Sequence, residues 1–210
     1  MKQLLLIISL SFTFFANAQT GLFTDERDGQ QYKTIVINSK KWFRENLRLQ
    51  TSSSYYPDIT KDSTNRKEGN YYSYKELNSL CPKGWHVITT PDWENFISLL
   101  LKTKNINEGV FKYDSLIRND DKNFSINMKG ADLLNDTLLQ LKPVGWIENR
   151  RIKSVSNLSL WIHDPQSNDE KFHLHIGKDG FVRHTHAHHI IDKPKKVRMF
   201  PVRCVCDLEQ

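Results

Sequence analysis

The chain has 210 residues, of which 38% are hydrophobic and 26% charged, with a formal net charge of +6 at pH 7. This length suits one domain with a substantial core, and the sequence holds no internal repeat and no low-complexity tract. No segment after residue 18 approaches the roughly 20 apolar residues that a membrane span needs. The sequence therefore predicts neither a repeat architecture nor a membrane-spanning helix in residues 19–210.

The N-terminus has the pattern of a secretory signal peptide. Lys2 precedes an apolar run over residues 4–15, and Ala16-Asn17-Ala18 forms a small-x-small cleavage signal. We expect residues 1–18 to be removed and residues 19–210 to form a single domain. The mature chain is then secreted, periplasmic or held at the cell surface.

The first predicted elements are two strands and a loop. Residues 31–37 are rich in β-branched side chains and follow the turn signal Asp28-Gly29, which predicts a strand. A second short strand over residues 41–43 would complete a hairpin. Residues 50–70 are polar and contain Pro57 and Gly69, which is typical of a long loop.

Two helices are predicted next. Residues 74–80 indicate a short helix, and a clearer one begins with Thr90 as N-cap and Pro91 at the first helical position. Asp92 suits the positive end of the helix dipole. Apolar residues then recur at helical spacing, which predicts one core-facing stripe: Trp93, Phe96, Ile97, Leu100 and Leu101.

The second half of the chain is predicted to be mostly strands. Residues 102–128 are polar and indicate an irregular insertion, whereas residues 158–162 and 172–176 return to strand-like alternation. A final strand covers residues 200–205. Short strands around two helices, without regular β–α–β alternation, predict an α+β domain with a mainly antiparallel sheet.

Three cysteines in an oxidising compartment predict one disulfide and one free thiol. Cys81 can pair with either Cys204 or Cys206, because these two positions share one side of a strand; we favour Cys204. Such a bond would tie the helical part of the domain to the last strand.

Six of the eight histidines lie between residues 173 and 189, around the turn signal Asp179-Gly180. If this pair forms a two-residue type I′ turn, His175 faces His184 and His173 faces His186. These four imidazoles would share one face of the hairpin and could bind zinc, copper or nickel. The alternative interpretation is a solvent-facing, pH-sensitive cationic strand without a metal.

Two other residue groups are candidates for ligand binding. Trp146 and Trp161 could offer stacking surfaces for sugars, although core packing is the favoured alternative. Lys193, Lys195 and Lys196 add to a basic C-terminal region. Outside the cytoplasm such a surface meets anionic glycans or a charged cell surface rather than nucleic acid, and a solvated face without a partner remains the alternative.

Catalytic signatures are missing from the sequence. It has no glycine-rich phosphate loop, no His-Glu-x-x-His helix and no nucleophile elbow. We therefore expect a protein that is not an enzyme and that requires no cofactor, with a divalent transition metal as the one candidate ion.

Several ordered motifs resemble the Fibrobacter succinogenes major paralogous domain family over residues 22–207. They are, in chain order, Phe23–Tyr32, Ile35–Ile37, Trp42, Glu45–Leu47, Cys81–His86, Asp92-Trp93 and Pro201–Val205. The chain departs from the family pattern at Asn38, at Val87-Ile88 and at residues 160–163. The last departure puts in doubt any ligand surface around Trp161 carried over from the family.

The Gly-Trp-His and Asp-Trp elements are also similar to the core helix signature of C-type-lectin-like domains. This likeness implies a twisted, mainly antiparallel sheet with two flanking helices and long loops, and it supports the Cys81–Cys204 pairing. The sequence lacks the calcium-binding motifs of sugar-binding lectins, and a fold alone does not determine a function. The expected function is a secreted, non-enzymatic binding or adhesion module for a polysaccharide or cell-surface ligand, with metal binding as the alternative.

Overall fold

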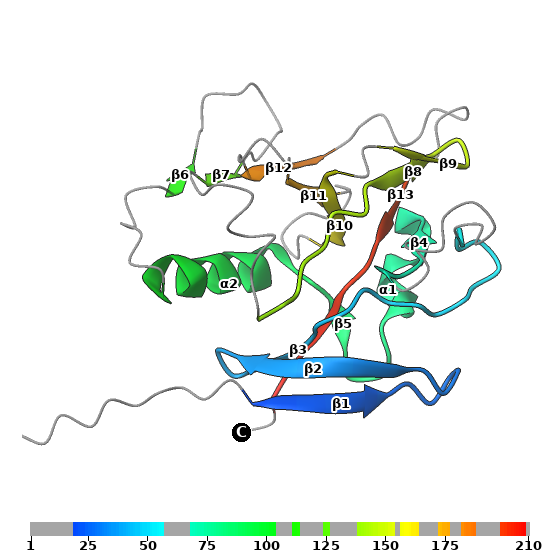
Figure 1. Cartoon of the computed structure of the whole chain (residues 1–210), viewed down its shortest axis with the longest axis horizontal. Helices are drawn as coiled ribbons and strands as arrows, with labels where there is room; N and C mark the ends of the chain where they lie inside the picture. Colours follow the sequence, from blue (N-terminus) through cyan, green and yellow to red (C-terminus); the bar gives the residue numbers. More distant parts are fainter. Residues whose placement is uncertain are drawn as a thin grey trace, which may run out of the picture.

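The computed structural model describes residues 19–56, 68–103, 111–113, 124–126, 138–153, 156–163, 172–176, 182–187 and 198–208. Within these residues the chain is an α+β protein with two α-helices and three sheets (Figure 1). All strand pairs are antiparallel, apart from one parallel bridge between Thr89 and His163. The predicted class is confirmed, but the strands are divided among three sheets instead of one.

The first sheet contains both ends of the described chain. Its strands, in spatial order, are β1 (Thr20–Thr24), β2 (Gln31–Ile37), β3 (Lys40–Phe43), β14 (Cys204–Asp207) and β5 (His86–Val87). The predicted hairpin of β2 and β3 is confirmed. Its turn residues Asn38 and Ser39 have φ values of 49° and 62°, as a two-residue type I′ turn requires.

The helical segment begins with a 3-10 turn, η2 (Tyr74–Glu76), which continues into α1 (Leu77–Leu80). The longer helix α2 spans Thr90–Thr103. Its N-cap is Thr89, whose hydroxyl accepts a hydrogen bond from the Asp92 backbone N–H, at 3.3 Å, while the Asp92 carboxylate accepts one from the Thr89 N–H, at 2.9 Å. The prediction of Thr90 as the N-cap was therefore wrong by one residue. A capping box pairs the N-cap with the side chain three residues later, and Asp92 lies three residues after Thr89.

The second sheet has the order β10 (Leu158–Ile162), β11 (Phe172–Ile176), β12 (Val182–Ala187), β7 (Phe124–Ile126) and β6 (Phe111–Tyr113). The bounds of β10 and β11 are those predicted. The prediction of an irregular insertion over residues 102–128 was wrong in part, since this range supplies the short strands β6 and β7. Three-residue strands carry too little alternation to stand out from a polar segment.

The third sheet has the order β4 (Tyr71–Tyr72), β13 (Arg198–Pro201), β8 (Trp146–Glu148) and β9 (Arg151–Lys153). The predicted final strand over residues 200–205 is in fact two strands, because β13 belongs to this sheet and β14 to the first. Between them the carbonyl of Val202 accepts a hydrogen bond from the Leu47 N–H, at 2.7 Å. The chain thus leaves one sheet and enters another within two residues.

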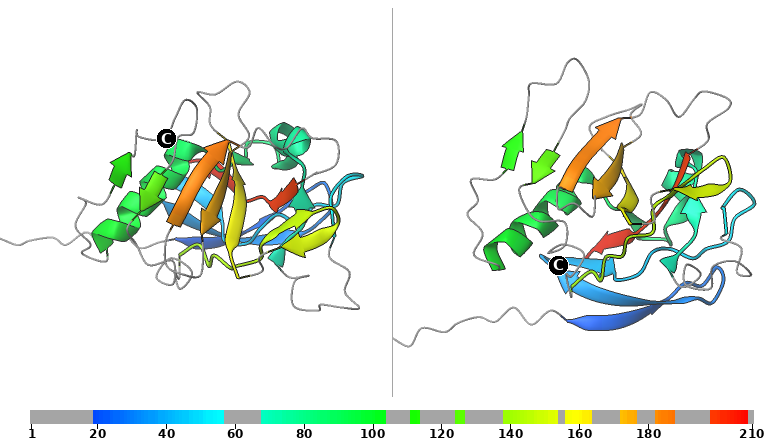
Figure 2. Two further views of the ribbon diagram at one scale, coloured as in Figure 1. Left: turned by 90° about the horizontal axis from the view of Figure 1, so that it is seen from above. Right: turned by 45° about the horizontal axis from the view of Figure 1, so that its top comes forward.

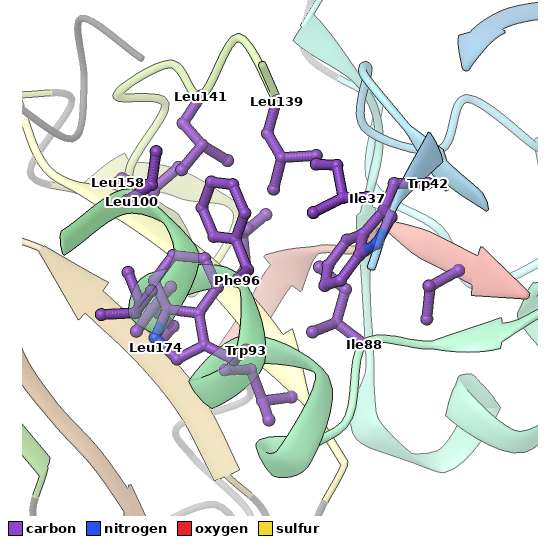
Figure 3. Close-up of a cluster of buried hydrophobic side chains, with 14 of the residues drawn as sticks. Ile37, Trp42, Ile88, Trp93, Phe96, Leu100, Leu139, Leu141, Leu158 and Leu174 are labelled. Carbon is purple, nitrogen blue, oxygen red and sulfur yellow. The ribbon is translucent and has the colours of Figure 1, made fainter. Parts of the chain in front are cut away.

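The main core lies around α2, between the first and second sheets (Figures 1 and 2). The predicted apolar stripe is buried at Trp93, Phe96, Ile97 and Leu100. Figure 3 shows Trp93, Phe96 and Leu100 of this stripe near residues of both sheets, namely Ile37 and Trp42 from the first and Leu158 and Leu174 from the second. Burial of one helix face from two sides accounts for the stability of this amphipathic segment.

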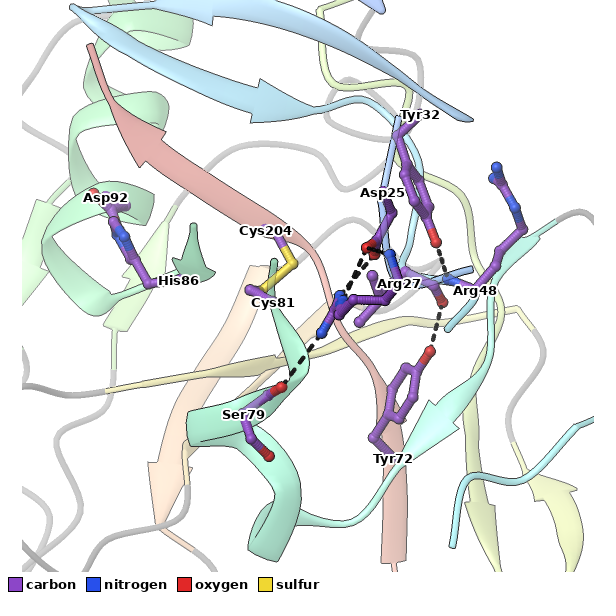
Figure 4. Close-up of a disulfide and its surroundings, with 11 residues drawn as sticks. Asp25, Arg27, Tyr32, Arg48, Tyr72, Ser79, Cys81, His86, Asp92 and Cys204 are labelled. Atoms are coloured by element: carbon purple, nitrogen blue, oxygen red, sulfur yellow. Dashed lines mark hydrogen bonds and ion pairs between the residues drawn. A yellow bond between two sulfur atoms is a disulfide. The ribbon is translucent and has the colours of Figure 1, made fainter. Parts of the chain in front are cut away.

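The predicted disulfide joins Cys81 to Cys204, with a Cα–Cα distance of 5.8 Å (Figure 4). Cys81 directly follows α1 and Cys204 begins β14, so the bond ties the helical segment to the first sheet. Cys206 is the free cysteine, and its partial burial raises the pKa of the thiol. The choice between Cys204 and Cys206 is therefore decided in favour of Cys204.

Candidate functional site

The third sheet has two chemically different faces. Its strand register places Tyr71, Ile147, Ile152 and Met199 on one face, where they form a small apolar cluster. The opposite face carries Tyr72, Trp146, Glu148, Arg151, Lys153, Arg198 and Phe200. These sets follow from the alternation of side chains along each strand and from the pairing of positions directly opposite each other.

Burial on the second face decreases steadily toward the β9 edge of the sheet. Tyr72 and Phe200 are fully enclosed, Trp146 is half-buried, and Lys153 and Arg151 are exposed. The indole of Trp146 stacks near the buried Phe200 ring, with centroids 6.3 Å apart. This contact helps to fix the position of the indole. We call the accessible part of this face, made by Trp146, Glu148, Arg151, Lys153 and Arg198, the open face. In Figure 1 the β8–β9 hairpin that carries most of it lies at the end of the molecule away from α2.

The charges of the open face are unbalanced. Arg198 Nε donates to Glu148 Oε2 at 2.8 Å, and this pair is largely shielded from water. Arg151 lies directly opposite Glu148 across the hairpin, and Lys153 lies opposite Trp146. Within the described residues, neither Arg151 nor Lys153 has a carboxylate at ion-pair distance. Two accessible cations therefore border the indole.

The β8–β9 hairpin, which carries most of the open face, is fixed by its turn and by hydrogen bonds from two tyrosines. Asn149 and Arg150 have φ values of 52° and 61°, the left-handed backbone of a type I′ turn. The Tyr55 hydroxyl donates to the Arg150 carbonyl at 3.3 Å, and the Tyr71 hydroxyl donates to the Val144 carbonyl at 2.6 Å. The side chains of the open face thus project from a fixed backbone.

A small pocket of about 220 Å³ lies at a different place, beside the disulfide. It is lined by Leu77, Asn78, Cys81, Trp85, His86, Val87, Thr89 and His163. This volume is below the range of about 300–1,000 Å³ that is usual for pockets that enclose drug-sized ligands, and two of the polar side chains around it, His86 and Thr89, have structural roles as hydrogen-bond partners of Asp92. We therefore regard the open face as the stronger candidate for ligand binding.

The polar group next to this pocket has a structural explanation. Asp92 is 1% exposed and accepts hydrogen bonds from His86 Nε2, at 3.1 Å, and from Thr89, while Lys40 Nζ lies 2.8 Å from its other oxygen. Burial by itself raises the pKa of the Asp92 carboxyl, but the hydrogen bonds from His86, Lys40 and Thr89 outweigh it and hold the pKa well below its usual value. Figure 4 shows His86 directed at Asp92. The carboxylate caps α2 and orients the imidazole.

Other motif residues from the sequence also have structural roles. Asn46 Oδ1 accepts hydrogen bonds from Arg203 Nε, at 3.2 Å, and from Arg203 Nη2, at 2.9 Å, and both residues are buried. Near the disulfide, Arg27 binds Asp25 at 2.7 Å and donates to the Ser79 carbonyl at 3.5 Å (Figure 4). The motifs at residues 23–32, 45–47 and 201–205 therefore connect distant segments of the chain.

The predicted ligand-binding residues have different outcomes. Trp161 is 0% exposed, donates from Nε1 to the Tyr72 carbonyl at 2.7 Å and packs edge-on against Phe200, so the idea that it contacts a ligand was wrong and the core interpretation holds. Trp146 is partly accessible and belongs to the open face. Lys193, Lys195 and Lys196 lie outside the described residues.

The register of the histidine hairpin agrees with the prediction at one position and differs at another. His173 lies opposite His186, as expected, but His175 lies opposite Arg183 instead of His184. The register shifts between Leu174 and His175, as a β-bulge would produce, so the simple two-residue register does not hold along the whole hairpin.

The metal site itself stays a prediction. Among the side chains that the structure describes, no group of three or more His, Cys, Asp or Glu residues is placed to hold a metal ion. The side chains of His173, His175, His184 and His186 lie outside that set.

Sequence reasoning missed Arg151 and Lys153 as candidate site residues. A signal for them exists in the stretch Trp146–Lys153, where two short alternating segments flank Asn149-Arg150. Asn at the first central position favours a type I′ turn, but the second position usually has Gly. With Arg there, the hairpin and the shared face of Trp146, Arg151 and Lys153 were not recognised.

Fold and site together define a disulfide-linked α+β domain with an open, positively charged sheet face. A family described as the Fibrobacter succinogenes major domain matches residues 35–206, and the chain belongs to this family. No curated protein and no solved structure matches the chain. Similarity to C-type-lectin-like domains therefore stays an expectation. Of the described residues, no helix has the length and apolar character to cross a membrane.

Proposed function

We propose that this protein is a secreted, non-enzymatic binding or adhesion module and that its open face contacts an extracellular polysaccharide or another cell-surface ligand. The observation that carries the proposal is the half-buried Trp146 at the accessible end of an otherwise enclosed aromatic row. The indole Nε1 is buried, so the accessible part of the ring is apolar carbon, and it lies beside the polar groups of the open face. Sugar rings, which have apolar faces and hydroxylated edges, fit such a surface.

Rigidity of the site supports a binding role. Trp146 lies on a strand paired with both β13 and β9, and Phe200 supports its ring. A ligand that settles on a fixed ring causes little further loss of side-chain entropy, so more of the contact energy appears as affinity. The open face resembles a preformed contact surface in this respect.

The extracellular location is supported by two independent features. Residues 1–18 have the pattern of a signal peptide, and the Cys81–Cys204 disulfide is of the kind that persists in oxidising compartments. A polysaccharide or cell-surface ligand is therefore available where the protein is expected to act.

The test is binding of the chain to immobilised polysaccharides, with Trp146→Leu and Trp146→Phe compared. Leucine keeps apolar bulk over Phe200 but removes the flat ring, so we expect the affinity to fall about tenfold, equivalent to about 1.4 kcal/mol. Phenylalanine keeps an aromatic face and should retain most of the binding. Thermal unfolding of each variant confirms that the domain is intact.

Trp85→Leu is the matched control, because Trp85 is also half-buried but lies next to the disulfide pocket. This variant should bind as the unmodified chain does. Loss of binding in Trp85→Leu with normal binding in Trp146→Leu would move the site to the pocket and refute the assignment of the open face. Absence of binding to every polysaccharide and cell surface tested would refute the proposed function.

A further inference from the structure

The open face carries more positive charge than it can neutralise internally. Glu148 is its one carboxylate, and Arg198 Nε already contacts that group at 2.8 Å. Arg151 and Lys153 are both exposed, and no described carboxylate forms an ion pair with either side chain. Glu148 lies opposite Arg151 but is already paired with Arg198, so three cations share one carboxylate and the open face keeps two uncompensated positive charges. An anionic partner would complement this charge.

The two cations have a defined position relative to the indole. Lys153 is the direct cross-strand partner of Trp146, at a Cα separation of about 5 Å for such pairs. Arg151 lies two residues before Lys153 on the same face of β9, about 7 Å away along the strand. A sugar ring resting on Trp146 would therefore have one cation at its edge and a second within reach of the neighbouring sugar.

We infer that the ligand of the open face is an anionic polysaccharide, one that carries carboxylate or sulfate groups on its sugars. The inference rests on the proposed function, because it names the ligand class for the same site. The apolar face of a sugar packs on Trp146. Its carboxylate or sulfate accepts hydrogen bonds from Lys153 and Arg151, and the guanidinium of Arg151 can donate two parallel bonds to either group.

The observations favour a glycan over a nucleic acid. Proteins that bind single-stranded nucleic acids stack successive bases on several aromatic side chains along a basic groove. The open face has a single accessible ring, Trp146, and it is a sheet surface rather than a groove. The disulfide also points to an oxidising compartment outside the cytoplasm, where polysaccharides are available as ligands.

The first experiment compares polygalacturonate with its fully methyl-esterified form, which has the same backbone but no charge. Binding of the full chain should be at least tenfold tighter for the charged polymer. The difference should shrink as the salt concentration is raised from about 50 mM to 500 mM, because exposed charges are screened over distances of a few ångströms at high ionic strength. Dextran sulfate and dextran form a second matched pair that tests sulfate.

The second experiment reverses the two charges with Arg151→Glu/Lys153→Glu. This variant should bind charged polymers at least tenfold more weakly, and its binding should lose most of the salt dependence. Lys33→Glu/Lys83→Glu is the matched control, because it changes the net charge equally at exposed positions on β2 and in the turn before β5. It should bind nearly as well as the unmodified chain.

The outcomes separate the two proposals. Equal binding to charged and neutral polymers that still depends on Trp146 would overturn the anionic class and leave the proposed function standing. Equal weakening by both double variants would also overturn it, since net charge alone would then explain the effect. If single-stranded oligothymidylate binds as tightly as polygalacturonate, the glycan class is overturned, because the site would then bind polyanions in general. Absence of binding to all four polymers and to every other glycan would overturn both proposals.

Discussion

The disulfide should supply a large part of the stability of this domain. Cys81 and Cys204 are separated by 123 positions, and cross-linking a loop of this length restricts the unfolded chain by about 5 kcal/mol on the loop-entropy relation. A domain of this kind is stable by about 5–15 kcal/mol in total. We therefore expect Cys81→Ala/Cys204→Ala to lower the free energy of unfolding by about 4–5 kcal/mol and to leave the domain marginally stable at 37 °C.

Urea unfolding at 25 °C, followed by tryptophan fluorescence, measures this change. Cys206→Ala is the control, because Cys206 is free and half-buried, and its replacement should change the free energy of unfolding by less than about 0.5 kcal/mol. A loss below about 1.5 kcal/mol in the double variant would refute the reasoning. So would a large loss in Cys206→Ala, which would mean that the thiol has a role that the bond does not explain.

Two further predictions concern single residues. Asp92→Asn should lower the free energy of unfolding by about 2 kcal/mol at pH 7, because it removes the buried negative charge and replaces one of the two oxygens that accept from His86, Lys40 and Thr89 by an NH₂ donor. Since the folded state depresses the pKa of Asp92, the contribution of this carboxylate is present above about pH 4 and declines as the pH falls further. The gap between wild type and variant should therefore narrow in urea titrations below pH 4, and a constant gap down to pH 2 would contradict this. Arg150→Gly should raise stability by about 0.5–1 kcal/mol, because φ at this position is 61° and glycine adopts this conformation without strain. A lower melting temperature in differential scanning calorimetry would show that the Arg150 side chain makes a stabilising contact.

Elements with a strong local pattern were predictable from the sequence. The strand over residues 31–37 is rich in β-branched residues and follows a turn signal, and the helix at residues 90–103 has a long apolar stripe at helical spacing. Weakly patterned elements were missed, among them Thr20–Thr24, Tyr71–Tyr72 and the hairpin Trp146–Lys153. Short strands of this kind owe their existence to partners elsewhere in the chain, and local composition does not reveal those partners.

The candidate site illustrates the same division. Trp146 and Trp161 were both candidates for stacking on sugars, yet Trp146 is half-buried with part of its surface accessible, whereas Trp161 is enclosed by Tyr72 and Phe200. Arg151 and Lys153 became candidate ligand-binding residues only because the register of the hairpin places them on the same face as Trp146. Exposure and proximity are properties of packing between distant segments, so neither can be obtained from residue type and spacing.

By itself, the sequence determined the α+β class and the family, and it narrowed the partner of Cys81 to Cys204 or Cys206, because alternation, capping residues and ordered motifs can be recognised locally along the chain. Tertiary structure alone decided how the strands divide among three sheets and which face of the β4–β13–β8–β9 sheet remains open. It also decided that Asp92 and Asn46 serve the scaffold. The physical reason is that hydrogen-bond partners and solvent access depend on which segments meet in space, and chain order does not specify this.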